Sequence, residues 1–330
     1  MNKPSRRTIT IVITESWTLR WSGVPPVEEP PPNTHNKEQS LTPLPAVRME
    51  TVNQIQENLI AYFRVFAGLP GITFGEGDVT WNVGGPGPHI LHTHFPPDTV
   101  DQQIDDLIRQ IGQAANSVDW FVFPSCQPAD LGERVAAHGL AGGPDDAWTL
   151  VGQIGGPGGN WLIADLTALP VVPSVSEGFH VEVVSNEAML GEWLQLSLTG
   201  FGNTPPPPEK WAENYFYAGY ARHGFGEEAH SLHYIGYLGD QPVTAATLLL
   251  AGGVAGLFDI STPTAFRRQG FGSAISRHLL QEAQARGYQQ AYVWSSAMGK
   301  GVYQRVGFVP VALGMREYCW QKRQLPIQPA

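Results

Sequence analysis

The sequence predicts an α/β (α+β) protein of two units, each a mixed, mostly antiparallel twisted sheet flanked by helices. Three observations support this fold class. The chain has 330 residues, a length that suggests two domains. Residues 231–260 have the pattern of an antiparallel meander, and a glycine-rich turn then leads into a helix. A pattern of strand, loop, short helix, glycine and apolar residue occurs at residues 120–140 and again at 291–308. The repetition indicates two related units.

Composition excludes several classes of function. Apolar residues make up 42% of the chain, which is enough for real cores, and no apolar run approaches the ~20 residues of a membrane span. The net charge of −10 argues against a nucleic-acid surface, which would need a basic stripe. Cys126 and Cys319 lie far apart in sequence and are expected to be free thiols. We therefore expect a cytoplasmic protein without nucleic-acid or membrane partners.

Residues 1–48 are predicted to form an extended, disordered, proline-rich segment. The apolar run at Ile9–Ile13 is short and β-branched, and no small-residue cleavage site follows it, so a signal peptide is not expected. Pro25–Pro32 and the polar residues up to Pro45 have the composition of a linker. Met49 opens the first predicted helix and is therefore a candidate translation start.

The first unit is predicted to span residues 49–172. Ile104, Leu107, Ile108 and Ile111 give its second helix one apolar face. Its expected elements after the Met49 helix are strands near Gly71–Val83 and His89–Phe95, a helix at Val100–Ala115, a strand at Trp120–Phe123 and a helix at Leu131–Leu140.

The spacing of three histidines in the first unit suggests a metal site. His92 and His94 would share one face of a strand, and His89 precedes them. No nearby Cys, Asp or Glu completes a tetrahedral set of ligands. We therefore prefer a structural or surface role for these histidines and expect no metal.

The second unit is predicted to span residues 179–323, after a junction at Pro170–Phe179. Its first elements are a strand at His180–Val184 and a helix at Glu187–Leu198. The prolines at 205–208 then form a stiff loop before a second helix, at about Glu209–His223. Trp211, Tyr215, Phe216 and Tyr220 share that helix. A core face is the preferred interpretation of these aromatic residues, and contact with a substrate is the alternative.

The most informative segment is a strand-to-helix turn that follows the meander Ser231–Leu238, Val243–Leu250 and Val254–Ile260. The turn has the form Arg-x-x-Gly-x-Gly, and its residues are Arg267, Arg268, Gln269, Gly270, Phe271, Gly272 and Ser273. The two glycines allow close approach of the backbone, and the first N–H groups of the helix face an anion with the positive end of the helix dipole behind them. The arginines add positive charge, so the turn suits a pyrophosphate. The helix ends at Arg286-Gly287.

A closing element follows the strand Ala291–Trp294. It reads Tyr303-Gln304-Arg305-Val306-Gly307-Phe308. Together, this element, the Arg-x-x-Gly-x-Gly turn and the meander resemble the GNAT N-acetyltransferase superfamily over roughly residues 179–320. The chain as a whole resembles tandem GNAT proteins in which the first copy is degenerate.

The resemblance implies acetyl-CoA as co-substrate, with no metal. It implies that the backbone from Phe258 to Ile260 pairs with the pantetheine arm and that the turn from Arg267 to Ser273 holds the pyrophosphate. Trp211 and Tyr215 are the candidate substrate-binding residues. Ser295 and Ser296 stand where the family often has an asparagine, and Ser296 is the candidate contact to the cofactor there.

The resemblance also implies roles for the catalytic candidates. Tyr303 matches the family's general acid, while packing against the cofactor is its alternative role. Asp259 is the candidate base, acting through water or holding the acceptor's ammonium group. It could equally tie the turn at Ser261–Pro263. His233 and Glu182 are weaker candidates, because each is more often a surface or satisfied polar group.

The first unit is not expected to bind acetyl-CoA in the same way. The corresponding helix entry, residues 94–99, has no glycine loop or arginine, and it contains two prolines and Asp98. We expect an N-acetyltransferase acting on a primary amine of a small molecule, amino acid or peptide. The alternative is a non-catalytic acyl-CoA-binding or regulatory tandem protein, and a homodimer is possible in either case.

Overall fold

The computed structural model describes residues 44–138, 140–141, 148–154, 160–171, 175, 177–225, 229–296 and 298–322. Most of the predicted N-terminal segment therefore lies outside the described residues. Residues 44–48 are described and contact the rest of the protein, because the amide of Ala312 donates to the carbonyl of Pro45 at 3.1 Å and Ala46 forms an isolated bridge with Ala312.

The first sheet has seven strands in the order β1-β2-β3-β4-β14-β6-β5. All neighbouring strands in it are antiparallel except β3 and β4. Its strands are β1 (Thr73–Gly75), β2 (Val79–Val83), β3 (His89–Thr93), β4 (Ser117–Val122), β5 (Leu140–Ala141), β6 (Trp148–Ile154) and β14 (Arg316–Lys322). The helices of this part of the chain are α1 (Met49–Arg64), α2 (Val100–Ile111) and α3 (Leu131–His138).

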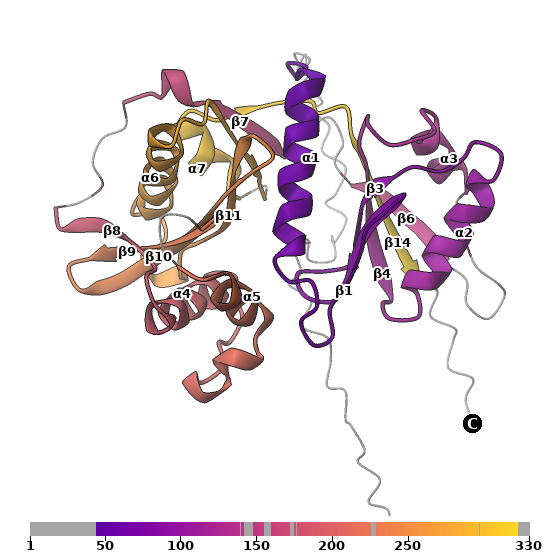
Figure 1. Ribbon diagram of the computed structural model, residues 1–330. Coiled ribbons are helices and arrows are strands. Elements are labelled where there is room, and N and C mark those ends of the chain that lie inside the picture. Colours follow the sequence, from indigo (N-terminus) through magenta and orange to yellow (C-terminus); the bar gives the residue numbers. More distant parts are fainter. Residues whose placement is uncertain are drawn as a thin grey trace, which may run out of the picture.

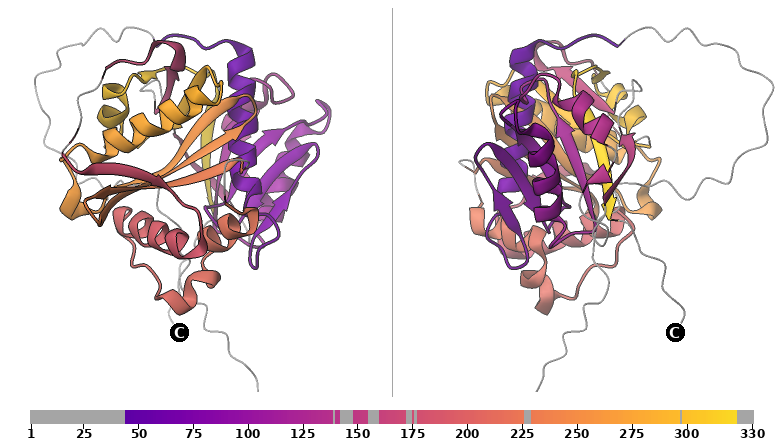
Figure 2. Two further views of the ribbon diagram at one scale, coloured as in Figure 1. Left: turned by 60° about the vertical axis from the view of Figure 1, so that its left-hand side comes forward. Right: turned by 90° about the vertical axis from the view of Figure 1, so that its right-hand side faces the viewer.

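The second sheet also has seven strands, in the order β13-β7-β12-β11-β10-β9-β8. They are β7 (Trp161–Asp165), β8 (Phe179–Val183), β9 (Ser231–Leu238), β10 (Gln241–Ala251), β11 (Val254–Ser261), β12 (Gln290–Trp294) and β13 (Val309–Pro310). Helices α4 and α5 lie on one side of this sheet and α6 and α7 on the other (Figure 2). The helices are α4 (Glu187–Gly200), α5 (Tyr215–His223), α6 (Phe271–Ala285) and α7 (Lys300–Arg305), with short 3₁₀ segments η1 (Leu166–Ala168), η2 (Pro208–Glu213) and η3 (Thr264–Phe266).

The two sheets exchange strands. β14, at the end of the chain, lies between β4 and β6 in the first sheet, and β7 lies between β12 and β13 in the second. The sheets therefore do not follow the predicted limits of 49–172 and 179–323, which would keep β7 in the first unit and β14 in the second. We call the first sheet with α1–α3 the first unit and the second sheet with α4–α7 the second unit.

Helix α1 stands between the two sheets (Figure 1). One face of it, including Val52, Ile55 and Leu59, is almost fully buried. Apolar residues at i, i+3 and i+7 form a stripe along one side of a helix, and burial of that stripe stabilises it. The large core cluster that contains these residues also includes side chains of both sheets, so the two units share one hydrophobic core.

The predicted helices and meander are present with small shifts at their ends, apart from one break. The helix expected at residues 209–223 is divided into η2 and α5, because Asn214 is extended and its side chain accepts a hydrogen bond from the amide of Phe216. Asn214 is thus an N-cap in the middle of the predicted helix. No helix in the described ranges is long and apolar enough to cross a membrane.

Candidate functional site

A bulge in the meander sets the geometry of the site. Ala245 on β10 faces Ser261 on β11, whereas Thr247 faces Phe258, so three residue steps on β11 match two on β10. The extra residue falls at Asp259, whose φ is 52°. Asp adopts this left-handed region more readily than most residues, and a bulge at such a point re-aims the side chains around it. The regular alternation of side chains between the two faces of a strand is therefore interrupted at residues 258–260.

Beyond this bulge the second sheet opens. The parallel strands β11 and β12 pair at Ala255–Ala291 and Gly256–Tyr292, and within the described residues they do not pair from Phe258 onward. At the end of β12, the amide of Ser295 donates to the carbonyl of Asn160 at 2.7 Å instead. The backbone edge of β11 from Phe258 to Ile260 is thus left unpaired on this side, and an extended ligand could add to it.

The turn after β11 leads into the N-terminus of α6 at this same opening. Gly270 is the N-cap and has a φ of 91°, a conformation in which glycine carries no steric penalty. A Cβ at Gly272 would meet nothing closer than 3.6 Å, so space exists beside the first turn. The hydroxyl of Ser273 is buried and has no hydrogen-bond partner in the described chain. Val175, which belongs to the segment before β8, lies next to Gly270.

The predicted turn residues act in different ways. Arg267 donates from Nε to the carbonyl of Thr262 at 3.0 Å and from Nη2 to the carbonyl of Gly200 at 2.7 Å, which ties the turn to the end of α4. Arg268 is exposed and has a φ of 62°. Its charge faces solvent, where a phosphate could meet it.

Phe271 and Gln269 contribute little side-chain chemistry to the opening. The ring of Phe271 is buried and stacks on Phe179 of β8, with ring centroids 5.4 Å apart. Gln269 is exposed, and its side-chain amide donates to the carbonyl of Ala265. Within this turn, backbone N–H groups are therefore the main donors for an anion.

Tyr303 lies on α7 and is buried. Its ring packs edge-on against Phe308, and a Cβ at Gly299 would come within 3.1 Å of it. Burial raises the pKa of the Tyr303 hydroxyl, so the side chain stays protonated across the physiological range. Ser296 is exposed, and its hydroxyl accepts from the amide of Gly299 at 3.2 Å, so it closes the turn that starts α7.

The carboxyl group of Asp259 is buried between two tyrosines. Tyr62 donates to Oδ1 at 3.0 Å and Tyr220 donates to Oδ2 at 2.6 Å. Burial raises the pKa of Asp259, and hydrogen bonds from Tyr220, Tyr62 and Thr247 oppose that rise. Asp259 is thus held by tyrosines, and the tie to the Ser261–Pro263 turn, which the sequence allowed equally, is not among its hydrogen bonds.

Sequence reasoning missed Tyr62. This residue lies on α1, 197 positions before Asp259, and its ring stacks on Phe258 with centroids 4.2 Å apart and planes 6° apart. An aromatic residue on the apolar face of a helix is ordinarily a core residue, so no local signal marks it. Only the packing of α1 against the second sheet brings it to Asp259.

The two weaker base candidates lie in different surroundings. His233 is buried on β9, its Nδ1 hydrogen-bonds with the hydroxyl of Thr247 at 3.0 Å, and its Nε2 is buried without a partner among the described residues. Burial lowers the pKa of His233 to about 3, so the ring is neutral. Its ring centroid is 3.9 Å from that of Tyr220. Glu182 is exposed on the edge strand β8, 3.4 Å from His180.

The candidate substrate-binding residues Trp211 and Tyr215 both pack against side chains or backbone of neighbouring helices. The indole of Trp211 fills the space above Gly191 of α4, where a Cβ would overlap it at 1.8 Å. Tyr215 packs edge-on against Phe66, 5.7 Å between centroids. Burial, and then the charge of Asp259, raise the pKa of the Tyr215 hydroxyl, which indicates that it lies on the Asp259 side of α5. Both residues therefore pack closely against neighbouring side chains.

The equivalent opening in the first unit is closed. Parallel strands β3 and β4 separate after Ile90–Trp120, but Gln127 then fills the gap. Its amide donates to the carbonyl of Thr93 and its carbonyl accepts from the amide of Phe95, both at 2.9 Å. Backbone groups that could bind an extended ligand are thus already paired, which supports the expectation that this unit does not bind acetyl-CoA in the same way.

Two of the three candidate histidines have side-chain partners, and the third, His94, is exposed. His89 is buried against Phe63 and Phe121, and His92 lies 3.4 Å from the side-chain amide of Gln56. Across the residues that the structure describes, no three His, Cys, Asp or Glu side chains gather as a metal site would need.

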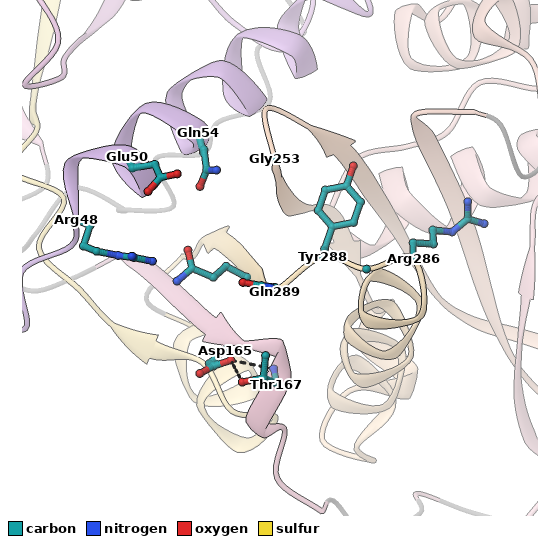
Figure 3. A pocket seen from close by; sticks show the side chains of 11 residues that line it. Arg48, Glu50, Gln54, Asp165, Thr167, Gly253, Arg286, Tyr288 and Gln289 are labelled. Carbon is teal, nitrogen blue, oxygen red and sulfur yellow. Dashed lines mark hydrogen bonds between the residues drawn. The ribbon is translucent and has the colours of Figure 1, made fainter.

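A polar cleft of about 690 Å³ lies beside the start of α1. Figure 3 shows the side chains that line it. The cleft is bounded by the start of α1, the β10–β11 hairpin and the chain after α6, and its charged lining residues are Arg48, Glu50, Asp165 and Arg286. The hairpin residue Gly253 precedes β11, whereas the opening at Phe258 is at its far end. This cleft is therefore distinct from the candidate site.

Comparison with known families agrees with this geometry. Residues 190–308 match the acetyltransferase (GNAT) family. This part of the chain is a GNAT domain. It belongs to a family of acetyltransferases, and the match runs from α4 through the turn at the start of α6 to Phe308.

Solved structures extend the likeness to most of the chain. A GCN5-related N-acetyltransferase from Kribbella flavida is 16% identical, with a TM-score of 0.55, and the match covers 86% of this chain and 98% of that one. A tandem GNAT protein from the clavulanic acid biosynthesis pathway is 14% identical with a TM-score of 0.49, covering 84% and 96%. At 16% identity the first likeness shows the fold, and it confirms the predicted class of two mixed sheets flanked by helices. No curated protein matches the sequence.

Proposed function

We propose that the GNAT domain transfers the acetyl group of acetyl-CoA to the primary amine of a small molecule, an amino acid or a peptide. The observation that carries this proposal is the open edge of β11, which ends at the glycine turn of α6. An extended ligand arm and an anionic head group could then bind to adjacent parts of one continuous backbone surface. The closed gap at Gln127 in the first unit shows that such an opening is not a necessary feature of the sheet.

Residues around the opening fit acetyl-CoA. The unpaired backbone from Phe258 to Ile260 would hold the pantetheine arm, and the N–H groups from Gly270 to Ser273 would hold the pyrophosphate. The exposed side chain of Arg268 would reach the ligand's outer part, and the hydroxyl of Ser296, which accepts from the amide of Gly299, would donate its own proton to the ligand. When bound, acetyl-CoA supplies the activated acetyl group.

Three protein groups would handle the protons. An acceptor amine arrives as an ammonium ion and must lose a proton before it attacks. We propose that the proton passes to Asp259 through the hydroxyl of Tyr220, which gives its own proton to the carboxylate and takes one from the ammonium. The raised pKa of Asp259 makes it a better base than an exposed carboxylate. Tyr303, protonated in its buried position, would give a proton to the departing sulfur.

The first test is cofactor binding. Acetyl-CoA at 100 times its dissociation constant should stabilise the protein by ~2.7 kcal/mol in a thermal-shift titration. Gly272→Asp should abolish that shift, because it puts bulk and negative charge where the pyrophosphate binds. Gln281→Asp, which adds the same charge at an exposed position farther along α6, is the matched control and should keep it. If acetyl-CoA raised the melting temperature of both variants equally, the proposed pyrophosphate site would be refuted.

Turnover with a panel of amines then separates the enzyme from the alternative, a non-catalytic acyl-CoA-binding protein. Tyr303→Phe should lower kcat roughly 100-fold or more while the acetyl-CoA affinity stays unchanged. Binding without turnover for any amine would favour the non-catalytic alternative. We also propose that the enzyme works in the cytoplasm, where its two cysteines, which are free thiols in the structure, would stay reduced.

A further inference from the structure

One polar contact at the candidate site joins the two units. Tyr62 belongs to α1, and Asp259 belongs to the bulge of β11. Tyr62 and Asp259 are 8% and 5% exposed, and their hydrogen bond is 3.0 Å long. A buried carboxylate is strongly destabilised unless donors satisfy it, so a hydroxyl in this place affects the charge state of Asp259 directly.

Tyr62 also contacts the residue before Asp259. Its ring lies parallel to the ring of Phe258, 4.2 Å away, and it packs edge-on against Phe66 of the same part of the chain. One side chain of the first unit therefore touches two successive residues of the bulge. Those residues form the start of the unpaired edge of β11 to which the acetyl-CoA arm would bind.

The position of Tyr62 is fixed by a second set of contacts one turn earlier on α1. Asn58 donates from Nδ2 to the carbonyls of Leu249, Ala251 and Val254 at 2.9–3.1 Å. Tyr292 donates to its Oδ1 at 3.0 Å. Residues i and i+4 lie on the same face of a helix, so these bonds set the register in which Tyr62 meets Asp259.

The helix that carries Tyr220 is attached to the first unit as well. Arg222 donates from Nη2 to the carbonyl of Val65 at 2.6 Å and from Nη1 to the carbonyl of Ala67 at 3.0 Å. Phe66 packs over Gly219, where a Cβ would come within 2.6 Å of its ring. The end of α1 thus sets the position of α5, and with it the second tyrosine on Asp259.

From this geometry we propose that the first unit is a working part of the acyl-transfer site, and that Tyr62 is a positioning residue for Asp259. The proposal rests on the proposed function and assigns the degenerate unit a task within it. Asp259 is faced by Tyr62 from α1, by Tyr220 and Tyr215 from α5 and by Thr247 from β10. The neutral ring of His233 on β9 packs against the ring of Tyr220.

The test compares Tyr62→Phe with wild type. The variant keeps the ring on Phe258 and removes one donor from Asp259. We expect unchanged acetyl-CoA affinity, a kcat at neutral pH at least roughly tenfold lower, and an acid limb of the pH profile moved to higher pH, because the Asp259 anion loses a hydrogen bond. Tyr234→Phe removes a hydroxyl from a buried tyrosine of the other core cluster and should leave all three unchanged.

A second readout does not depend on turnover. The carboxyl carbon of Asp259 can be titrated by NMR in protein labelled at aspartate, with Asp259→Asn to assign the signal. Tyr62→Phe should raise the pKa of Asp259. An unchanged titration would overturn the proposal even if kcat fell, since Tyr62 would then contribute only packing. If wild type turned over no amine at all, the proposed function would fail, while the titration would still report whether Tyr62 controls Asp259.

Discussion

At the scale of single residues, two carboxyl groups of the described chain are buried in different ways. Asp259 accepts hydrogen bonds from two tyrosine hydroxyls, which offset part of the cost of burial. Glu317 on β14 is 3% exposed, and its pKa is raised to about 8 by burial and by the negative charge of Asp119 on the neighbouring strand. Glu317 is therefore largely protonated in the folded protein at neutral pH.

The raised pKa of Glu317 predicts how stability depends on pH. Because the folded pKa of about 8 exceeds the ordinary value of 4.5, the folded state holds an extra proton between these values. The stabilisation that comes from this extra proton is complete below about pH 4.5 and is lost as pH rises through 8. Glu317→Gln should flatten this slope, so the variant gains stability over wild type between pH 5 and 9. The slope that is removed is at most about 1.4 kcal/mol for each pH unit.

Urea unfolding of both proteins at several pH values measures this difference, since every other titrating group is common to the two. Glu133→Gln, on the exposed surface of α3, is the control and should leave the pH dependence close to that of wild type. A constant difference between Glu317→Gln and wild type from pH 5 to 9 would contradict the assigned pKa.

Residues with local signals could be predicted from the sequence, and residues with distant partners could not. Gly270 and Gly272 stand out because a strand-to-helix turn needs them, and the structure places both at the start of α6. Asp259 was a candidate, but its role depended on Tyr62, which lies 197 positions away. A hydroxyl on a core face gives no sign of which carboxylate it will meet, because that is decided when the two units pack.

At the scale of elements, function depends on strand pairs that separate. β11 and β12 stay apart after Gly256, whereas the corresponding pair in the first unit is joined again by Gln127. The bulge at Asp259 adds one residue to β11, and this redirects its edge. The meander was predictable from its strand-like runs and the turns between them. The bulge and the break at Asn214 were not, because each depends on a backbone conformation selected by neighbouring elements.

The fit of η2 on α4 gives a prediction at this scale. Gly191→Ala would place a methyl group inside the present position of the Trp211 ring, so η2 must shift. We expect a loss of about 1–3 kcal/mol of stability and a higher KM for the amine acceptor, with unchanged acetyl-CoA affinity. Adding Trp211→Ala removes the overlap. If Gly191→Ala cost the same stability in the Trp211→Ala variant as in wild type, the two residues would not be coupled.

At the scale of the whole molecule, the exchange of β7 and β14 makes the two units depend on each other. Each sheet contains an internal strand from the other half of the predicted division, and α1 packs between the sheets (Figure 1). The sequence predicted the meander and the strands beside it but neither β7 nor β14, and it could not show which sheet takes a given strand. A strand with both faces buried has the same apolar pattern in either sheet. Packing over the full chain decides the arrangement.

This arrangement predicts that the protein unfolds in one step. Trp120 lies in the first sheet and Trp193 on α4, and both are fully buried, so their separate ¹⁹F NMR signals in protein labelled with fluorotryptophan report on each unit. Both signals should change at the same urea concentration. Trp320→Ala on β14 should cost about 3–5 kcal/mol and lower both midpoints together, because β14 completes the first sheet but follows the second unit in the chain. If the variant lowered only the Trp120 midpoint, the units would be independent, and the first could not hold Tyr62 against Asp259 as the acyl-transfer site requires.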